Sequence, residues 1–407
     1  MDGLIVLSYS GGLDTSAIVP WLKDTYGAPV LCYTADVGQG GHELLGLEAK
    51  AVRSGAVGCV VDDLREEFVT RVILPTLKAG AVYARTYLLG TSMARPVIAA
   101  GQVAAARAAG GVALAHGCTG KGNDQVRFEL TFQALAPDLQ VIAPWREWTF
   151  RGREDLIAYL HGKGVPVPVT EAKPFSRDRN LWHCSHEGGI LEDPATPPPA
   201  DLFLLTADPQ QAPDEPEELT IGFEAGVPVT VDAVPYAPVA LIEHLNEIAG
   251  AHGVGRADVV EDRLVGMKSR GIYETPAGTV LRAAHRELEQ IVLDRRTLAL
   301  KDLLAARYAD LVYEGRWWTQ EREALDALVE VTQRHVTGTV RIRLFKGQAT
   351  VVGRESPFSL YQPQYATFEA DAVYNHADAG GFIRLFGLPV RIGAEVLRRA
   401  AAEAPVA

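Results

Sequence analysis

The first part of the chain alternates short apolar runs with longer segments of helical pattern. The apolar runs predict strands at residues 4–7, 29–35, 58–61, 112–115 and 139–142. Helices are expected between them, at 17–22, at 43–53, from 63 onward and at 94–109. Because these strands are apolar along their whole length, they predict a doubly wound parallel sheet covered on both faces, an α/β fold. In such sheets ligands bind at the carboxyl ends of the strands.

The regular alternation ends after Gly164. Two hairpins are predicted at 221–232 and 339–353, and the proline-rich acidic segment 193–218 is expected to be a long surface loop. Helices are expected at 238–249, at 280–312 as one or two, at 322–333, at 379–386 and at 394–402. The sequence therefore predicts an α/β domain at 1–165, an α+β domain at 166–365 and a C-terminal helical arm at 366–407.

The composition is that of a globular protein of two or three domains, with 407 residues of which 47% are hydrophobic and 22% charged. The net charge of −12 argues against a nucleic-acid-binding protein, which usually carries a basic surface. The four cysteines form no Cys-x-x-Cys pair, and no signal or membrane-spanning segment is evident. We therefore expect a reduced, cytoplasmic chain that binds neither nucleic acid nor membrane.

The first chemical motif is Ser-Tyr-Ser-Gly-Gly-Leu-Asp-Thr-Ser at 8–16, directly after the first strand. Glycines allow a tight turn with exposed backbone N–H groups, and the start of the following helix adds the positive end of its dipole. The hydroxyls supply further donors, so the loop is suited to phosphate oxygens. No Lys follows the glycines, which distinguishes the loop from the Gly-x-x-x-x-Gly-Lys-Ser/Thr motif.

Two further turns, 35–41 and 117–124, follow strands of the same predicted sheet. The second belongs to the polar segment 117–129, which combines glycines, a carboxylate, an amide and two cations. Arg127 lies about one helical turn from Asn123, so both side chains can face one ligand. An arginine at this place is suited to forking onto a carboxylate, although a polar capped turn is the plain alternative.

Three more segments are polar for less evident reasons. In 87–96, a Thr-Ser pair precedes a helix expected to start near Ala94, which suggests capping as readily as ligand binding. In 173–192, His183, Cys184 and His186 lie close together, but no second ligand cluster is evident, so no metal site is predicted. Taken alone, 261–276 has the pattern of a charged surface loop.

The segment 8–16 resembles the loop of the PP-loop ATP pyrophosphatases. The five segments 8–16, 87–96, 117–129, 173–192 and 261–276, in this order along the chain, resemble argininosuccinate synthase, and the resemblance runs from about residue 7 to 388. The resemblance implies a PP-loop nucleotide-binding domain at 1–165, a synthetase and multimerisation domain at 166–365, and a homotetramer. It also implies an ATP-dependent ligase of arginine biosynthesis. That enzyme joins L-citrulline to L-aspartate through citrullyl-AMP and releases AMP and pyrophosphate.

The resemblance also implies site residues. Those for ATP are Ser8, Tyr9, Ser10, Gly11, Gly12, Leu13, Asp14, Thr15, Ser16, Ala35 and Gly117. Those for citrulline are Tyr87, Ser92, Arg127, Ser176, Ser185, Glu261 and Tyr273, and those for aspartate are Thr119, Asn123 and Asp124, with Asn123 also reaching citrulline.

Three residues are predicted to be catalytic. Asp124 and Arg127 belong to the substrate set, and Asp124 is expected to orient or deprotonate the incoming amine. Asp14 is expected to help hold Mg²⁺ or the loop, because ATP chemistry calls for Mg²⁺.

The chain departs from the family pattern at Ser8, where Ala is common, at His186, where Tyr is common, and at 361–365, which is usually acidic. Two other functions stay open at this point. One is a different PP-loop ligase, although the chain lacks the basic character of a tRNA enzyme and any visible glutaminase domain. The other is an ATP or amino-acid sensor without turnover.

Overall fold

Five parallel strands form the sheet of the N-terminal part of the chain in a computed structural model that describes residues 1–167, 175–367 and 373–403. Their order across the sheet is β3-β2-β1-β4-β5. The strands are β1 Leu4–Ser8, β2 Val30–Asp36, β3 Gly58–Asp63, β4 Gly111–Ala115 and β5 Gln140–Ile142. The order reverses direction at β1, which confirms the predicted doubly wound α/β sheet.

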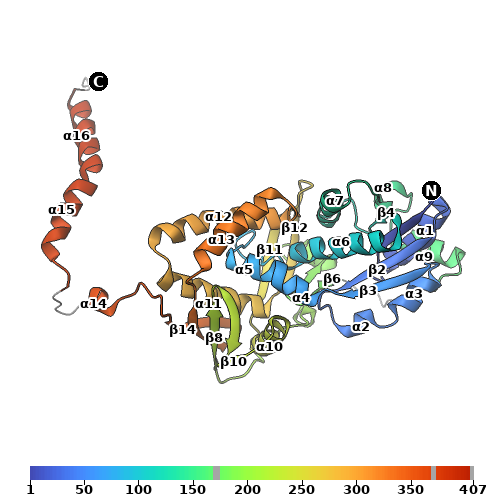
Figure 1. Ribbon diagram of the computed structural model, residues 1–407, viewed down its shortest axis with the longest axis horizontal. Coiled ribbons are helices and arrows are strands. Elements are labelled where there is room, and N and C mark those ends of the chain that lie inside the picture. Colours follow the sequence, from blue (N-terminus) through green and yellow to red (C-terminus); the bar gives the residue numbers. More distant parts are fainter. Residues whose placement is uncertain (168–174, 368–372, 404–407) are drawn as a thin grey trace. The chain divides into compact units, whose positions relative to one another are not determined.

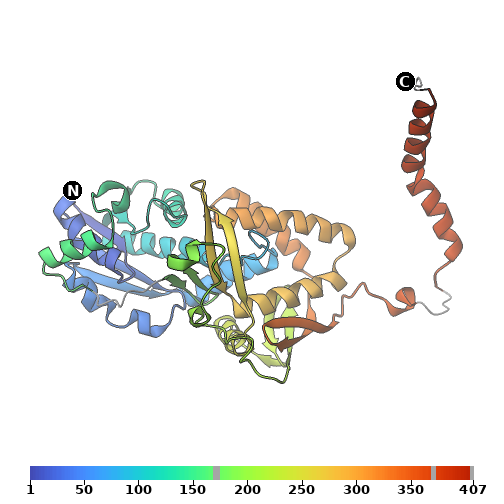
Figure 2. The same cartoon turned by 180° about the vertical axis from the view of Figure 1, so that it is seen from behind.

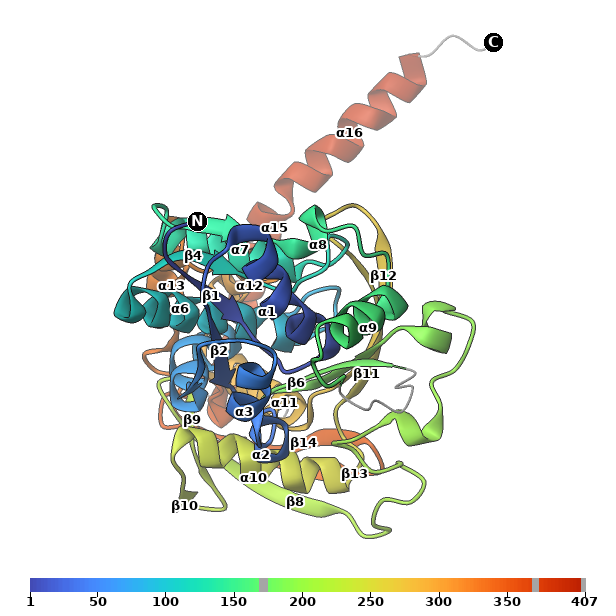
Figure 3. The ribbon, with the colours of Figure 1, turned by 90° about the vertical axis from the view of Figure 1, so that its right-hand side faces the viewer.

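Helices cover both faces of this sheet because successive strand residues point to opposite sides. In β1, fully buried Val6 belongs to the apolar core shared with α6 (Gly90–Ala109), while Ile5 and Leu7 belong to the core shared with α1 (Leu13–Tyr26). Figure 1 shows α6 along the sheet, and Figure 3 shows β1 between α6 and the pair α1 and α9. The remaining α-helices of this part are α2 Gly41–Leu44, α3 Leu47–Arg53, α4 Arg65–Phe68, α5 Leu74–Lys78, α7 Asp124–Leu135, α8 Pro144–Glu147 and α9 Arg153–Gly162, with a π-helical segment at Val69–Ile73 between α4 and α5.

Two helix predictions were wrong in detail. The single helix expected at 43–53 is two, α2 and α3, because Gly46 adopts a left-handed backbone with φ of 72° between them. The helix expected to start near Ala94 starts at Gly90. Thr91 and Ser92 therefore lie inside its first turn instead of capping it, and Leu89 is the residue at the cap.

The two predicted hairpins are confirmed, and they belong to one five-stranded sheet with the order β10-β9-β8-β13-β14. Its strands are β8 Glu217–Glu224, β9 Val227–Val231, β10 Val234–Pro235, β13 Gly338–Phe345 and β14 Gln348–Glu355. Helix α11 (Pro276–Val292) packs against β13 and β14, and α10 (Pro238–Ala251) packs against α11. The region expected as one or two helices is α11 and α12 (Arg295–Tyr313), and α13 (Gln320–Gln333) follows.

A four-stranded antiparallel sheet, with the order β11-β12-β7-β6, was not predicted. Its strands are β6 Ser176–Arg179, β7 Cys184–Glu187, β11 Arg256–Asp262 and β12 Lys268–Glu274. Figure 2 shows the β11–β12 hairpin as the long yellow pair of strands. The expectation of a surface loop at 261–276 was therefore wrong. Within 173–192, Lys173 and Pro174 lie outside the described residues.

The chain divides into two compact units, Met1–Phe358 and Ser359–Ala407. The second contains α14 Pro363–Ala366, α15 His376–Phe386 and α16 Leu388–Glu403, which confirms helices near 379–386 and 394–402. Several large apolar side chains of α15 and α16 are exposed, among them Phe382, Phe386 and Leu397. Across the described residues, no helix is both long and apolar enough to cross a bilayer.

One face of the four-stranded sheet carries a buried carboxylate, Glu274, whose exposed fraction is 0%. It accepts hydrogen bonds from the backbone N–H groups of Leu204, Leu205 and Thr206 at 2.8 Å each, and from the Thr206 hydroxyl at 2.7 Å. His186 Nε2 lies 2.8 Å from the same carboxylate. These contacts fasten the long segment between β7 and β8 to β12.

Cys184 stands beside this cluster, and the ligand atoms of Cys184, His186 and Glu274 lie within 4.8 Å of one another. Arg177 donates to Nδ1 of His186 at 3.2 Å, so the proton of a neutral His186 sits on Nε2 and points to Glu274. Since protein donors already occupy both oxygens of Glu274, the cluster is explained by hydrogen bonding alone.

Replacing Glu274 with Gln is expected to lower the free energy of unfolding by about 3 kcal/mol near pH 7, because an amide cannot satisfy donors on both sides. Burial opposes the charge of Glu274, but hydrogen bonds from His186, from the N–H groups of Leu204 and Leu205 and from the Thr206 side chain outweigh it and lower its pKa. A carboxyl whose pKa is lower in the folded chain than in the unfolded chain stabilises the fold at pH values above its unfolded pKa. That contribution is lost as the pH falls through its folded pKa. The urea midpoints of the parent and of Glu274→Gln should therefore converge below about pH 4. Exposed Glu224, replaced with Gln, is the control. Equal midpoints near pH 7 would contradict the expectation.

Candidate functional site

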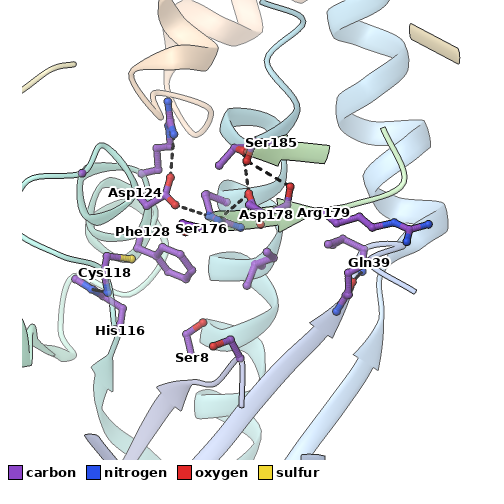
Figure 4. Close-up of a pocket in the computed structure, with 18 of the residues that line it drawn as sticks. Ser8, Gln39, His116, Cys118, Asp124, Phe128, Ser176, Asp178, Arg179 and Ser185 are labelled. Carbon is purple, nitrogen blue, oxygen red and sulfur yellow. Dashed lines mark hydrogen bonds and ion pairs between the residues drawn. The ribbon is translucent and has the colours of Figure 1, made fainter. Parts of the chain in front are cut away.

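A cavity of about 540 Å³ lies at the carboxyl ends of β1, β2 and β4 and under one face of the four-stranded sheet. Figure 4 shows Ser8 at the end of a strand in the lower part of the view, Asp178 and Ser185 above it, and Asp124 on a helix to the left. All three turns predicted at strand ends, 8–16, 35–41 and 117–124, contribute lining residues. The topology of the parallel sheet thus brings the predicted motifs together.

The loop after β1 presents hydroxyls to the cavity. Ser8, Tyr9, Ser10 and Thr15 line it, and the hydroxyls of Ser10 and Thr15 are 3.2 Å apart. Helix α1 starts immediately after Gly12, so its first N–H groups have no partner within the helix. Together these donors form a place for an anion.

Several loop residues shape the turn without lining the cavity, namely Gly11, Gly12, Leu13, Asp14 and Ser16. Gly11 needs its left-handed backbone, with φ of +70°, and its carbonyl accepts a hydrogen bond from Lys50 of α3. Partial burial raises the pKa of Asp14, while Arg153 opposes that rise.

The loop after β4 and the start of α7 hold an ionic network at the side of the cavity. The Asp124 carboxylate lies 2.9 Å from Arg95 of α6 and 2.9 Å from Arg127 of α7. Arg95 also lies 2.9 Å from Asp178 of β6, and Arg127 donates to the backbone carbonyl of Tyr313 at 2.9 Å. Burial opposes ionisation of Asp124, but the two guanidinium groups outweigh it, so the pKa of Asp124 is lowered.

The face of the four-stranded sheet toward the cavity, here called the near face, carries seven polar residues that line the cavity. Directly paired residues of antiparallel strands share a face, and the pairs are Ser176 with Glu187, Asp178 with Ser185, Ser185 with Tyr273, and Glu261 with Ser269. The seven are Ser176, Asp178, Ser185, Glu187, Glu261, Ser269 and Tyr273.

Tyr273 is fixed in place on the near face. Its ring stacks on that of Tyr87 with centroids 4.3 Å apart, and its hydroxyl donates to Glu261. Burial, then the neighbouring Tyr87 and Glu261, raise the pKa of Tyr273, so its hydroxyl keeps its proton and stays a donor.

Most of the predicted site residues line this cavity, including Ala35, Tyr87, Gly117, Thr119 and Asn123. Ser92 does not; it is fully buried on α6.

Seven charged lining residues were missed: Glu43, Arg95, Arg177, Asp178, Arg179, Glu187 and Arg263. Glu187 follows Ser185 by two positions, so recognising β7 as a strand would have placed it on the same face.

The charges around the cavity are mixed. Cationic side chains are Arg95, Arg127, Arg177, Arg179 and Arg263, and acidic side chains are Glu43, Asp124, Asp178, Glu187 and Glu261. Such a surface can bind ligands that carry both a carboxylate and an ammonium, beside an anion held at the loop after β1.

Comparison with known proteins places both parts of the chain in one family. Residues 4–166 match the family model described as Arginosuccinate synthase N-terminal HUP domain, and residues 175–393 match Arginosuccinate synthase C-terminal domain. The chain is 59% identical to argininosuccinate synthase of Pelotomaculum thermopropionicum, over 97% of this chain and 98% of that protein. It is 60% identical to that of Roseiflexus sp., over 96% of each, and 58% identical to the chloroplastic enzyme of Arabidopsis thaliana, over 96% and 79%. Among solved structures, a tRNA thiolase from Methanococcus maripaludis covers 42% of this chain and 60% of its own with a TM-score of 0.28 and 11% identity, a likeness too weak to bear on function.

Proposed function

The chain belongs to the argininosuccinate synthase family, ligases of arginine biosynthesis, and from this premise we propose that it joins L-citrulline to L-aspartate through citrullyl-AMP. The observation that carries the proposal is that one cavity unites an anion-binding loop with a surface suited to two zwitterionic amino acids. The proposal assigns nucleotide binding to 1–165, synthesis and multimerisation to 166–365, and an arm to 366–407.

In the first step, the ureido oxygen of citrulline attacks the α-phosphorus of ATP and pyrophosphate leaves. The loop 8–16 binds the leaving group through backbone N–H groups and the hydroxyls of Ser10 and Thr15. Ala35 and Gly117, at the ends of β2 and β4, contact the adenosine. The loop thereby stabilises charge that develops only as the bond to pyrophosphate breaks.

Citrulline binds along the near face in this proposal. Arg127 forks onto its α-carboxylate, and Glu261, aligned by Tyr273, binds its ammonium. Ser176 and Ser185 supply hydroxyls from the neighbouring strands, and the Tyr87 ring lines the same part of the cavity. Ser92, which the resemblance also implies for citrulline, is fully buried on α6 and does not line the cavity. Holding the ureido group against the nucleotide makes the first step effectively intramolecular.

Aspartate binds at the loop 117–124, through Thr119, Asn123 and Asp124. Its amine attacks the carbon of citrullyl-AMP, a C–N bond forms, and AMP leaves with the electrons of the C–O bond. The lowered pKa of Asp124 supports the orienting role over the proton-accepting one, because a carboxylate held between two guanidinium groups is a weak base.

Mg²⁺ neutralises charge on the triphosphate when it is bound there. The cavity residues of the loop 8–16 are hydroxyls and backbone, which fits an ion held chiefly by phosphate oxygens and water. Asp14 is not among the residues that line the cavity, so we assign it to holding the loop. We also propose a homotetramer, with the apolar side chains of α15 and α16 as interface material.

Release of pyrophosphate from ATP and Mg²⁺ tests the proposal when citrulline and aspartate are omitted in turn. We expect release to require citrulline, and AMP and argininosuccinate to appear only when aspartate is also present. Binding of ATP by folded protein without citrulline-dependent release would contradict the proposal and favour a sensor. Release with another amino acid or a tRNA would favour a different PP-loop ligase.

A further inference from the structure

Glu187 is a carboxylate of the cavity that belongs to neither of the two proposed amino-acid sites. It ends β7 on the near face, directly opposite Ser176 and two residues after Ser185. Its side chain is 39% exposed, and it lines the cavity. It therefore faces the space between the residues assigned to the two amino acids.

Arg263 ties Glu187 to the aspartate loop. Its guanidinium lies 3.1 Å from the Glu187 carboxylate and donates to the backbone carbonyl of Lys121 at 3.2 Å. The next residue, Leu264, donates its backbone N–H to the Asn123 side chain at 2.8 Å. The turn between β11 and β12 thus places one carboxylate beside the loop that binds aspartate and the strand that binds citrulline.

We propose that Glu187 is the catalytic residue that accepts the proton of the aspartate amine in the second step. This inference rests on the proposed function. The aspartate ammonium gives one proton to the Glu187 carboxylate, and the freed lone pair forms the C–N bond to citrullyl-AMP. The C–O bond to AMP then breaks and its electron pair stays on AMP. The second proton of the amine passes to the imino nitrogen of the isourea, which makes the product a guanidinium, and Glu187 later returns its proton to solvent.

The other carboxylates near Glu187 are already engaged. Asp124 lies between Arg95 and Arg127, Asp178 pairs with Arg95, and Glu261 accepts from Tyr273. Among the described residues, Glu187 has one ion-pair partner, Arg263, and its own side chain stays partly exposed.

Burial, opposed by Arg263 and reinforced by Glu261, Asp124 and Asp178, raises the pKa of Glu187 to about 7. A base with such a pKa is ionised near and above neutrality and lies closer to the amine in proton affinity than an ordinary carboxylate. As the pH falls below about 7, Glu187 takes up its proton and the second step should slow.

The test separates the two steps with Glu187→Gln, which keeps the shape and an acceptor for Arg263. We expect argininosuccinate formation to fall about a hundredfold. Citrulline-dependent positional isotope exchange in ATP, measured without aspartate, should stay within about threefold of the parent, because the first step does not use this proton. The acid limb of kcat/KM for aspartate, present in the parent, should disappear.

Two further variants complete the design. Glu187→Asp keeps a carboxylate on a side chain that is shorter by one methylene, so the carboxylate lies further from the amine. We expect about tenfold slower turnover with the acid limb retained. Glu192→Gln, exposed and five positions further along, is the control and should behave as the parent.

Equal loss of isotope exchange and turnover in Glu187→Gln would overturn the proposal, as would unchanged turnover or an unchanged acid limb. If the parent itself shows no citrulline-dependent exchange, the proposed function has failed, a result distinct from failure of the variant alone.

Discussion

Arg127→Leu is expected to lower kcat/KM for citrulline about a thousandfold, equivalent to about 4 kcal/mol. Arg127 is buried, with an exposed fraction of 4%, and its guanidinium contacts both Asp124 and the Tyr313 carbonyl. Loss of the side chain removes the proposed partner of the citrulline carboxylate and leaves Tyr313 without its donor. A buried charged group that loses its partner costs far more than an exposed one.

Steady-state kinetics with citrulline varied at saturating ATP and aspartate measure this effect. ATP binding by the folded variant should persist, because Arg127 belongs to α7 and not to the loop 8–16. Arg107→Leu is the matched control, since Arg107 lies near the end of α6, is exposed, and forms an ion pair with Asp138. A change of less than about tenfold in Arg127→Leu would remove Arg127 from the proposed site.

Asp124→Asn is expected to lower kcat about a hundredfold at every pH from about 6 to 9, with a higher KM for aspartate. The lowered pKa means that Asp124 is ionised throughout this range, so the amide removes the same charge at each pH. Arg95 and Arg127 then lose the carboxylate that spaces them, and the aspartate amine loses an acceptor.

The shape of the pH profile decides between two roles for Asp124. If Asp124 orients the amine, the variant keeps the acid limb of the parent, displaced downward. If the acid limb vanished in Asp124→Asn and persisted in Glu187→Gln, Asp124 would be the proton acceptor and the proposal for Glu187 would be wrong. The two variants are therefore best measured side by side.

The parallel sheet and the three turns that line the cavity could be predicted because each strand is apolar and each motif follows a strand directly. Once strands such as 4–7 and 112–115 are recognised, the topology alone puts their carboxyl ends at one edge. Helix limits were less certain, since a glycine such as Gly46 breaks a helix that composition favours.

The four-stranded sheet escaped prediction because polar residues occupy both of its faces. In β7, Ser185 and Glu187 face the cavity, while His186 faces buried Glu274, so no alternation of apolar and polar positions marks the strand. The residues of this sheet entered only through the family resemblance, and that resemblance did not single out Glu187. Contacts such as Arg95 with Asp124 join distant segments, which no local pattern reveals.

Because successive residues of β7 face opposite sides of the sheet, substitutions at neighbouring positions should lower cellular activity for different reasons. Cys184 and His186 are packed with Glu274, so changes there should reduce the quantity of protein that a cell accumulates, while each surviving molecule works normally. Ser185 and Glu187 face the cavity, so changes there should leave the quantity normal and slow each molecule. Growth at lower temperature would rescue variants of the first pair and not of the second. Neighbouring codons would therefore cause loss of activity in two different ways, through less protein or through slower protein.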